Sequence, residues 1–153
     1  MMHRLIMAIG VVVAAWLAVG CGGSKDDATS APLTRAQYTN QANAICKKFT
    51  KQRKAAAAAW TEKLPGGAGA VDAHVDEGFE EVIAPSIREE AEQLANLAPP
   101  EQDAVKIARM VRNLSEGSRV FARVGAEGVS RPPIHAFQNA AKAYGLEACF
   151  ELY

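Results

Sequence analysis

An apolar run that ends just before a cysteine constrains this chain most, because it decides which part of the sequence can fold. The run Leu5–Val19 follows a short start that contains Arg4, and Gly20 separates it from Cys21. A positive start, a short apolar stretch and small residues before a cleavage point are typical of a secretory signal. We therefore predict that residues 1–20 are a signal peptide. The run is shorter than the about 20 residues that span a bilayer, and an uncleaved membrane anchor is the alternative.

The end of this run resembles a known lipidation site. Ala18-Val19-Gly20-Cys21 is similar to the bacterial lipobox, with alanine at the position where leucine is commonest. The resemblance implies cleavage before Cys21 and acylation of its thiol, often followed by acylation of the new amino terminus. Two or three acyl chains hold a protein stably on a membrane, whereas one chain binds marginally. We expect an exported chain anchored to the outer face of the cytoplasmic membrane, with lipid contacted through acylated Cys21.

The rest of the sequence predicts a linker and one domain. Residues 21–33 are mostly small and polar, which is typical of a flexible linker, and residues 34–153 follow as the domain. The chain is 49% hydrophobic and 22% charged, close to globular averages, so wholesale disorder is excluded. Its formal net charge of zero lacks the basic excess of nucleic-acid binders, and we expect no nucleic-acid partner.

The three cysteines are Cys21, Cys46 and Cys149. An odd number of cysteines in an exported protein leaves one thiol without a disulfide partner. If lipid occupies Cys21, the other two cysteines can pair with each other. Because disulfides persist in oxidising compartments, we predict a Cys46–Cys149 disulfide. It would close a loop of about 100 residues and stabilise the fold by roughly 4.7 kcal/mol in the chain-entropy model. Two buried free thiols are the alternative, and no metal-ligand spacing accompanies them.

The domain divides into four segments of helical periodicity. Breaks at Pro65–Gly69, Pro99–Pro100 and Gly125–Pro133 separate these segments, and no segment shows the sustained alternation of a strand. We therefore predict an all-α, four-helix up-and-down bundle that one disulfide staples. In that order the fourth helix runs antiparallel to the first, which lets Cys149 approach Cys46.

Several local signals sharpen this expectation. Thr34 and Gln37 have the spacing of a capping box, Pro85 should kink or split the second helix, and Gly145 is placed to end the fourth. The apolar positions expected to face the core are Tyr38, Ala42, Ile45, Phe49, Ala56, Trp60 and Leu64 in the first segment, Val71, Val75, Phe79, Val82, Ile83, Ile87, Leu94 and Leu97 in the second, Ile107, Val111, Leu114 and Phe121 in the third, and Ile134, Phe137, Ala140, Ala141 and Tyr144 in the fourth.

No motif in the sequence predicts a reaction. The serine-nucleophile, phosphate-loop and di-metal helix patterns do not occur. Asp72 and Asp76 share a helix face but His74 projects away from it, and acidic residues in a first turn are favoured by the helix dipole. His135 has no obvious acidic partner. We expect no enzyme, catalytic residue, metal or cofactor; the alternative, a hydrolase, would depend on His74 or His135.

Charge is segregated along the chain. The first segment is basic through Lys47, Lys48, Lys51, Arg53 and Lys54, the second is acidic and includes Glu89, Glu90 and Glu92, and the third is basic again. We interpret these runs as solvated faces that contribute little energy each but disfavour wrong helix pairings. The alternative for residues 47–54 is contact with anionic lipid headgroups.

Several short segments together suggest a family. They are the lipobox, the polar linker, Tyr38 with Ala42-Asn43-Ala44-Ile45-Cys46, Leu97-Ala98-Pro99-Pro100, and Ala143-Tyr144-Gly145-Leu146 with Cys149. With them the chain resembles small uncharacterised actinobacterial lipoproteins over most of its mature length. The resemblance implies that Cys46 and Cys149 pair, and it implies no reaction or ligand.

From these observations we expect a membrane-anchored binding or scaffolding module. Its partner would be an envelope protein or a small apolar ligand. The first alternative is a carrier that holds the apolar ligand between its helices, where an alanine-rich core and the break at Pro85 leave room. The second is a protein retained by an uncleaved anchor.

Overall fold

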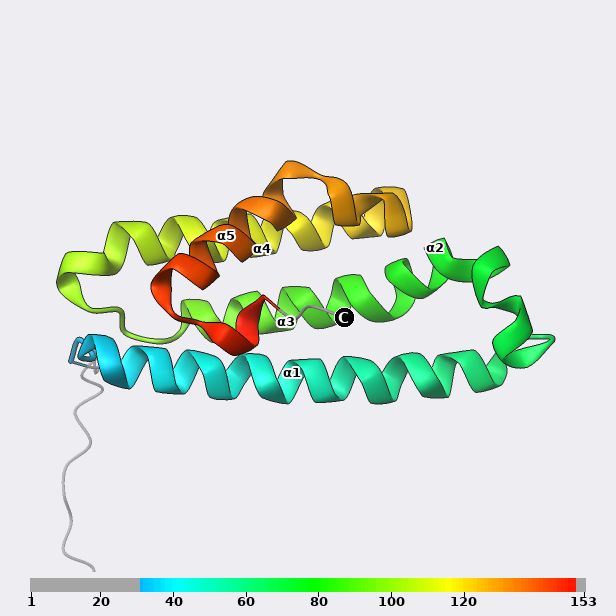
Figure 1. Ribbon diagram of the computed structural model, residues 1–153, viewed down its shortest axis with the longest axis horizontal. Coiled ribbons are helices and arrows are strands. Elements are labelled where there is room, and N and C mark those ends of the chain that lie inside the picture. Colours follow the sequence, from blue (N-terminus) through cyan, green and yellow to red (C-terminus); the bar gives the residue numbers. More distant parts are fainter. Residues whose placement is uncertain (1–30, 151–153) are drawn as a thin grey trace, which may run out of the picture.

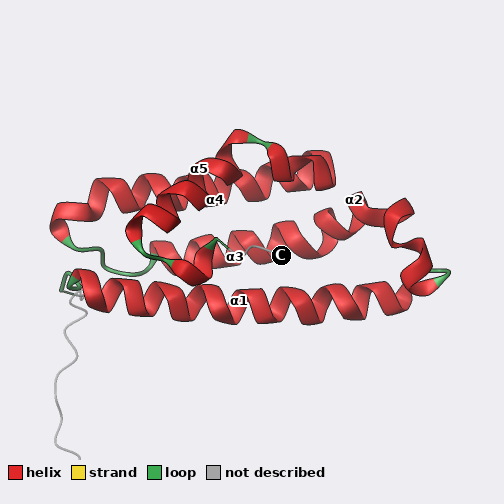
Figure 2. Ribbon diagram, viewed as in Figure 1, coloured by secondary structure: helices red, strands yellow, loops and turns green. Residues whose placement is uncertain are grey.

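The computed structural model describes residues 31–150, and every regular element in that range is helical (Figure 2). The longest helix, α1 (Arg35–Lys63), has 29 residues and extends along one side of the molecule for about 43 Å. Next to it lies α3 (Ala84–Ala95), which packs against α4 (Ala104–Val124), and α4 in turn carries α5 (Pro132–Tyr144) (Figure 1). The all-helical prediction is confirmed for these residues.

Shorter helical turns join the long helices. They are η1 (Gly67–His74), α2 (Val75–Gly78), η2 (Phe79–Ile83), η3 (Glu101–Asp103), η4 (Gly125–Ser130) and η5 (Glu147–Cys149). The turn η2 is a π-helical turn, in which the Ala84 N–H bonds to the carbonyl of Phe79. Pro85 follows directly, as the second residue of α3. Proline donates no helical hydrogen bond and its ring conflicts with the carbonyl four residues earlier. The expected break at Pro85 therefore takes the form of a wider turn before it, in a helical path that continues.

Local capping signals act as the sequence predicts. The Thr34 hydroxyl accepts from the Gln37 N–H at 3.3 Å, and the Gln37 side chain accepts from the Thr34 N–H at 2.9 Å, which completes the capping box. At the end of α5, Gly145 has a φ of 91°, a left-handed conformation that glycine adopts without strain. The Leu146 N–H then bonds to the Ala141 carbonyl at 2.9 Å, so the chain turns back toward α1.

The core follows the predicted apolar stripe closely in α4 and less closely in α1. All four positions predicted in the third segment are buried. In α1, Tyr38, Ala42 and Phe49 are buried, but Ala56 is exposed. The expectation for Ala56 is wrong because the buried stripe continues from Phe49 to Arg53, four residues on, and then to half-buried Ala57. Because Arg53 is charged, the apolar pattern in the sequence passed over it, and the predicted stripe moved to Ala56.

Candidate functional site

The predicted signal peptide and Cys21 lie outside the described residues. The predicted linker enters the described part of the chain at Leu33, which packs against the core and whose N–H bonds to the Ala98 carbonyl at 3.2 Å. The linker therefore arrives at the end of the molecule where α1 begins and where the α3–α4 connection lies (Figure 1). Within residues 31–150, no helix has the length and apolar character to cross a membrane.

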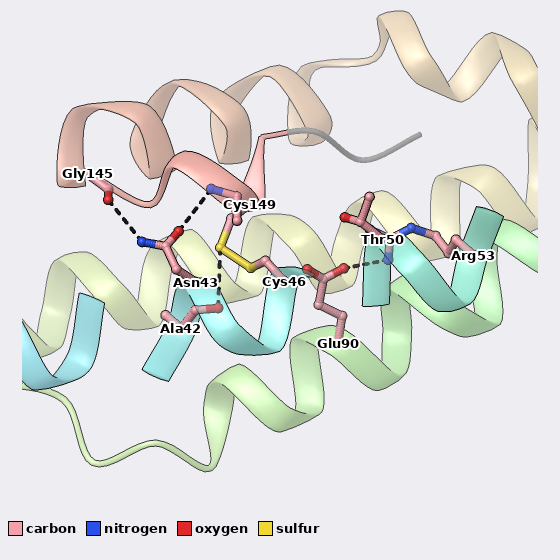
Figure 3. The surroundings of a disulfide bond; sticks show 9 residues. Ala42, Asn43, Cys46, Thr50, Arg53, Glu90, Gly145 and Cys149 are labelled. Atoms are coloured by element: carbon pink, nitrogen blue, oxygen red, sulfur yellow. Dashed lines mark hydrogen bonds and ion pairs between the residues drawn. A yellow bond between two sulfur atoms is a disulfide. The ribbon is translucent and has the colours of Figure 1, made fainter. Parts of the chain in front are cut away.

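The predicted cysteine pair forms a disulfide between α1 and η5. Cys46 and Cys149 are fully buried, and their Cα atoms are 4.9 Å apart. Asn43, one turn earlier on α1, accepts from the Ala148 N–H at 2.9 Å and donates to the Gly145 carbonyl at 3.4 Å (Figure 3). One covalent bond and one side-chain amide together fasten the carboxyl-terminal turn to α1.

A buried ion pair lies further along α1, on the side that faces α3. Arg53 Nη1 is 2.6 Å from Glu90 Oε2, and the side chains are 2% and 0% exposed. Arg53 also donates to the hydroxyls of Ser86 and Thr50, each at 3.5 Å, whereas Glu90 Oε1 has no hydrogen-bond partner in the described part of the chain. Burial raises the pKa of Glu90, and the charge and hydrogen bond of Arg53 oppose this rise. The interpretation of all these charges as solvated is wrong for this pair.

The acidic cluster near His74 separates into two contacts. His74 Nδ1 lies 2.9 Å from Glu77 Oε2, one turn away on the same helical path. Asp76 instead accepts from the Ala126 N–H at 2.9 Å and so attaches α2 to η4. His135 is exposed on α5. Within residues 31–150, no three histidine, cysteine, aspartate or glutamate side chains gather as a metal site would require.

A groove between α3 and α4 is the strongest candidate for a binding site. Its volume is about 550 Å³, inside the about 300–1,000 Å³ of typical small-molecule sites. Most of its lining is apolar, and its charged residues lie away from the α3–α4 connection. The lining residues are Ala91, Glu92, Leu94, Ala95, Leu97, Pro99, Ala104, Ile107, Ala108, Val111, Arg112, Ser115 and Arg119.

The groove continues into a second, polar hollow of about 430 Å³. The two share Glu92, Ser115 and Arg119, and the second adds Arg88 and Glu80 among others. Together they form one feature on the outer face of α3 and α4, apolar at one end and charged at the other. We call it the α3–α4 groove.

Sequence reasoning did not identify this groove. A signal for it exists in α4, where Ala104, Ala108 and Arg112 repeat every four residues and therefore share one helix face. The pattern has no special meaning until a second helix borders it. A helical repeat of small residues is ordinary, and the facing residues of α3 come from a different segment.

The basic run of α1 borders a separate hollow of about 480 Å³. Lys47, Lys51 and Lys54 line it with Thr50, Ala148 and Glu147. The three lysines are exposed, as predicted for a solvated face. Comparisons with models of protein families, with curated proteins and with solved structures find no match to this chain.

Proposed function

We propose that this chain is an exported lipoprotein, anchored to the outer face of the cytoplasmic membrane through acylated Cys21, and that its helical domain is a binding or scaffolding module rather than an enzyme. The observation that carries the proposal is the buried disulfide between Cys46 and Cys149. Disulfides persist in oxidising compartments outside the cytosol. The bond uses two of the three cysteines, which leaves Cys21, at the end of the apolar run, for lipid.

Metabolic labelling with an alkyne analogue of palmitate tests the anchor. The wild-type chain should carry the label and sediment with membranes, and Cys21→Ser should lose both properties. The matched control is the double variant Cys46→Ser with Cys149→Ser, which removes two thiols and should keep the label. If the wild-type chain carries no label and its membrane-bound form still contains residues 1–20, as intact mass would show, an uncleaved anchor holds the protein instead.

The second candidate function is that of a carrier for a small apolar ligand. The α3–α4 groove favours it, because its apolar end offers a concave surface of ordinary ligand-site volume. Native mass spectrometry distinguishes this candidate from a scaffold. A carrier should retain additional mass that disappears on denaturation, whereas a scaffold should show the bare chain and cross-link to an envelope protein.

For the domain itself we propose the up-and-down order of four helices. The support for it is that α3 contacts α1, α4 contacts α3, and α5 contacts α4. The connection between α3 and α4 is short, which favours antiparallel neighbours. In this arrangement the groove lies on the outer side of the central pair.

A further inference from the structure

We propose that the α3–α4 groove binds a single-chain anionic amphiphile, with its acyl chain along the apolar end and its headgroup at Arg88 and Arg112. The inference rests on the carrier function proposed above and names the class of ligand. The shared chemistry is one alkyl chain that ends in a carboxylate or a phosphate. A free fatty acid and a lysophospholipid are two sources of it.

The apolar end has the shape that one alkyl chain needs. Ala95 of α3 and Ala104 and Ala108 of α4 line it with Leu97, so small side chains leave a channel between the two helix backbones. From Ala104 to Arg112 the channel follows α4 for about 12 Å at the ordinary helical rise. Covering this surface with an alkyl chain would remove apolar area from water on both partners.

The charged end has arginines without partners. Arg88 and Arg112 are exposed, and their side chains form no ion pair or hydrogen bond with other residues in the range 31–150, whereas the Arg119 side chain bonds to Glu116 at 3.0 Å. Guanidinium groups match carboxylate and phosphate oxygens with two parallel hydrogen bonds. Because neither arginine has a side-chain partner, a bound anion would displace none. Glu80 and Glu92 also line this end and would repel the anion.

The polarity of the groove agrees with a lipid that comes from the membrane. Its apolar end includes Leu97 and Pro99, which flank Ala98, the residue that accepts the hydrogen bond from Leu33 where the linker enters. The proposed anchor tethers the domain by this end, and the flexible linker lets this end turn toward the membrane. An amphiphile drawn straight out of the outer leaflet leaves headgroup first, and its tail points back to the membrane. That is the orientation in which the groove would hold it.

Calorimetric titration of the full chain carrying Cys21→Ser tests the proposal, since this variant lacks acyl chains of its own that could fill the groove. The probes are laurate, dodecyl phosphate and dodecanol, each below the concentration at which it self-associates. We expect laurate and dodecyl phosphate to bind at least about tenfold more tightly than dodecanol, the difference that one charge-assisted hydrogen bond supplies. The anion that binds more tightly indicates the source of the natural ligand: laurate indicates a fatty acid, and dodecyl phosphate indicates a phospholipid.

Charge variants test the headgroup site. The double variant Arg88→Glu with Arg112→Glu should weaken the binding of dodecyl phosphate by about tenfold or more and leave the affinity for dodecanol unchanged. The matched control, Arg109→Glu with Lys51→Glu, makes the same change of charge outside the groove at two exposed residues that form no ion pair in the described range, and it should have a much smaller effect. Glu92→Gln should tighten binding of both anions. If the two double variants weaken binding equally, the headgroup assignment is overturned while the carrier function stands.

Steric variants test the tail site. Ala108→Trp should abolish binding of all three probes, because the exposed Ala108 side chain lies inside the groove. Val105→Trp is the control, since Val105 is 85% exposed and outside the groove. Thermal melts of each variant should match that of the parent chain. If no probe binds the parent chain, the inference fails, whereas the carrier function fails only if native mass spectrometry also shows the bare chain. The anchor at Cys21 is unaffected because labelling tests it separately.

Discussion

We divide α1 after Arg53 into a near half (residues 35–53) and a shorter far half (residues 54–63), and these two segments differ in what holds them. The near half, next to the linker entry, carries Cys46, the Asn43 side chain that bonds to the carboxyl-terminal turn, and buried Arg53. It packs against α3 and η5. The far half is an alanine run whose contacts are with η1 and η2, and most of its residues are exposed. Helix propensity sustains the far half, whereas tertiary contacts sustain the near half. One continuous helix therefore combines a strongly fastened segment with a weakly fastened one, and the following four predictions test this difference.

Removal of the disulfide should have the largest effect. Because the bond spans 103 residues of sequence, the double variant Cys46→Ala with Cys149→Ala should lose roughly 4.7 kcal/mol of unfolding free energy. Urea denaturation of the wild-type chain with and without reductant measures the same quantity independently. An unchanged midpoint on reduction would show that the Asn43 contacts and the core suffice for the near half.

Loss of Arg53 should come next. Arg53→Met leaves the carboxylate of Glu90 buried without its counterion, and removal of one member of such a pair costs about 3–5 kcal/mol near neutral pH. The double variant Arg53→Met with Glu90→Leu should recover most of this loss, since no charge is left in the core. Denaturant unfolding of Arg53→Met, of Glu90→Leu and of the double variant gives the coupling energy between the two side chains. A double variant as unstable as Arg53→Met would contradict this explanation.

The pH dependence of stability should reveal Glu90. Burial raises its pKa above the ordinary value of 4.5, so the folded chain binds this proton more tightly than the unfolded chain does. Its contribution to stability is therefore fully present below pH 4.5 and is lost as the pH rises through the raised pKa of the folded state. Glu90→Gln should remove this loss, and Arg53→Met should enlarge it. Unfolding free energies measured from pH 4 to pH 8 in about one-unit steps would show this; equal slopes in all three proteins would refute it.

A matched pair of alanines should show the smallest but most direct contrast. Ala42 is fully buried in the near half, and Ala56 is exposed in the far half. Ala42→Leu overfills the core and should cost about 1–3 kcal/mol, whereas Ala56→Leu should stay within about 0.5 kcal/mol of the parent chain. Thermal denaturation of the two variants compares them. Similar losses in both would mean that the far half packs as tightly as the near half.

The parts of this fold that were predictable from the sequence depend on neighbours along the chain. Thr34 and Gln37 cap α1 because their hydrogen bonds span three residues, and Gly145 ends α5 because glycine accepts a left-handed conformation there. The α4 stripe was also predictable, since its apolar residues repeat with the helical period. The cysteine pair followed from counting thiols in a chain expected to be exported.

The remaining features needed the tertiary structure, because each depends on what a second helix brings near. In the sequence Arg53 is one basic residue in a run of solvated lysines. It becomes a core residue because Glu90 of α3 faces it. Arg88 and Arg112 are ordinary surface arginines in the sequence, and they line the two adjoining hollows of one groove because α3 and α4 are adjacent. Local hydrogen bonding and periodicity act over a few residues and are encoded there. Burial, ion pairing and grooves depend on distances between segments, which packing decides.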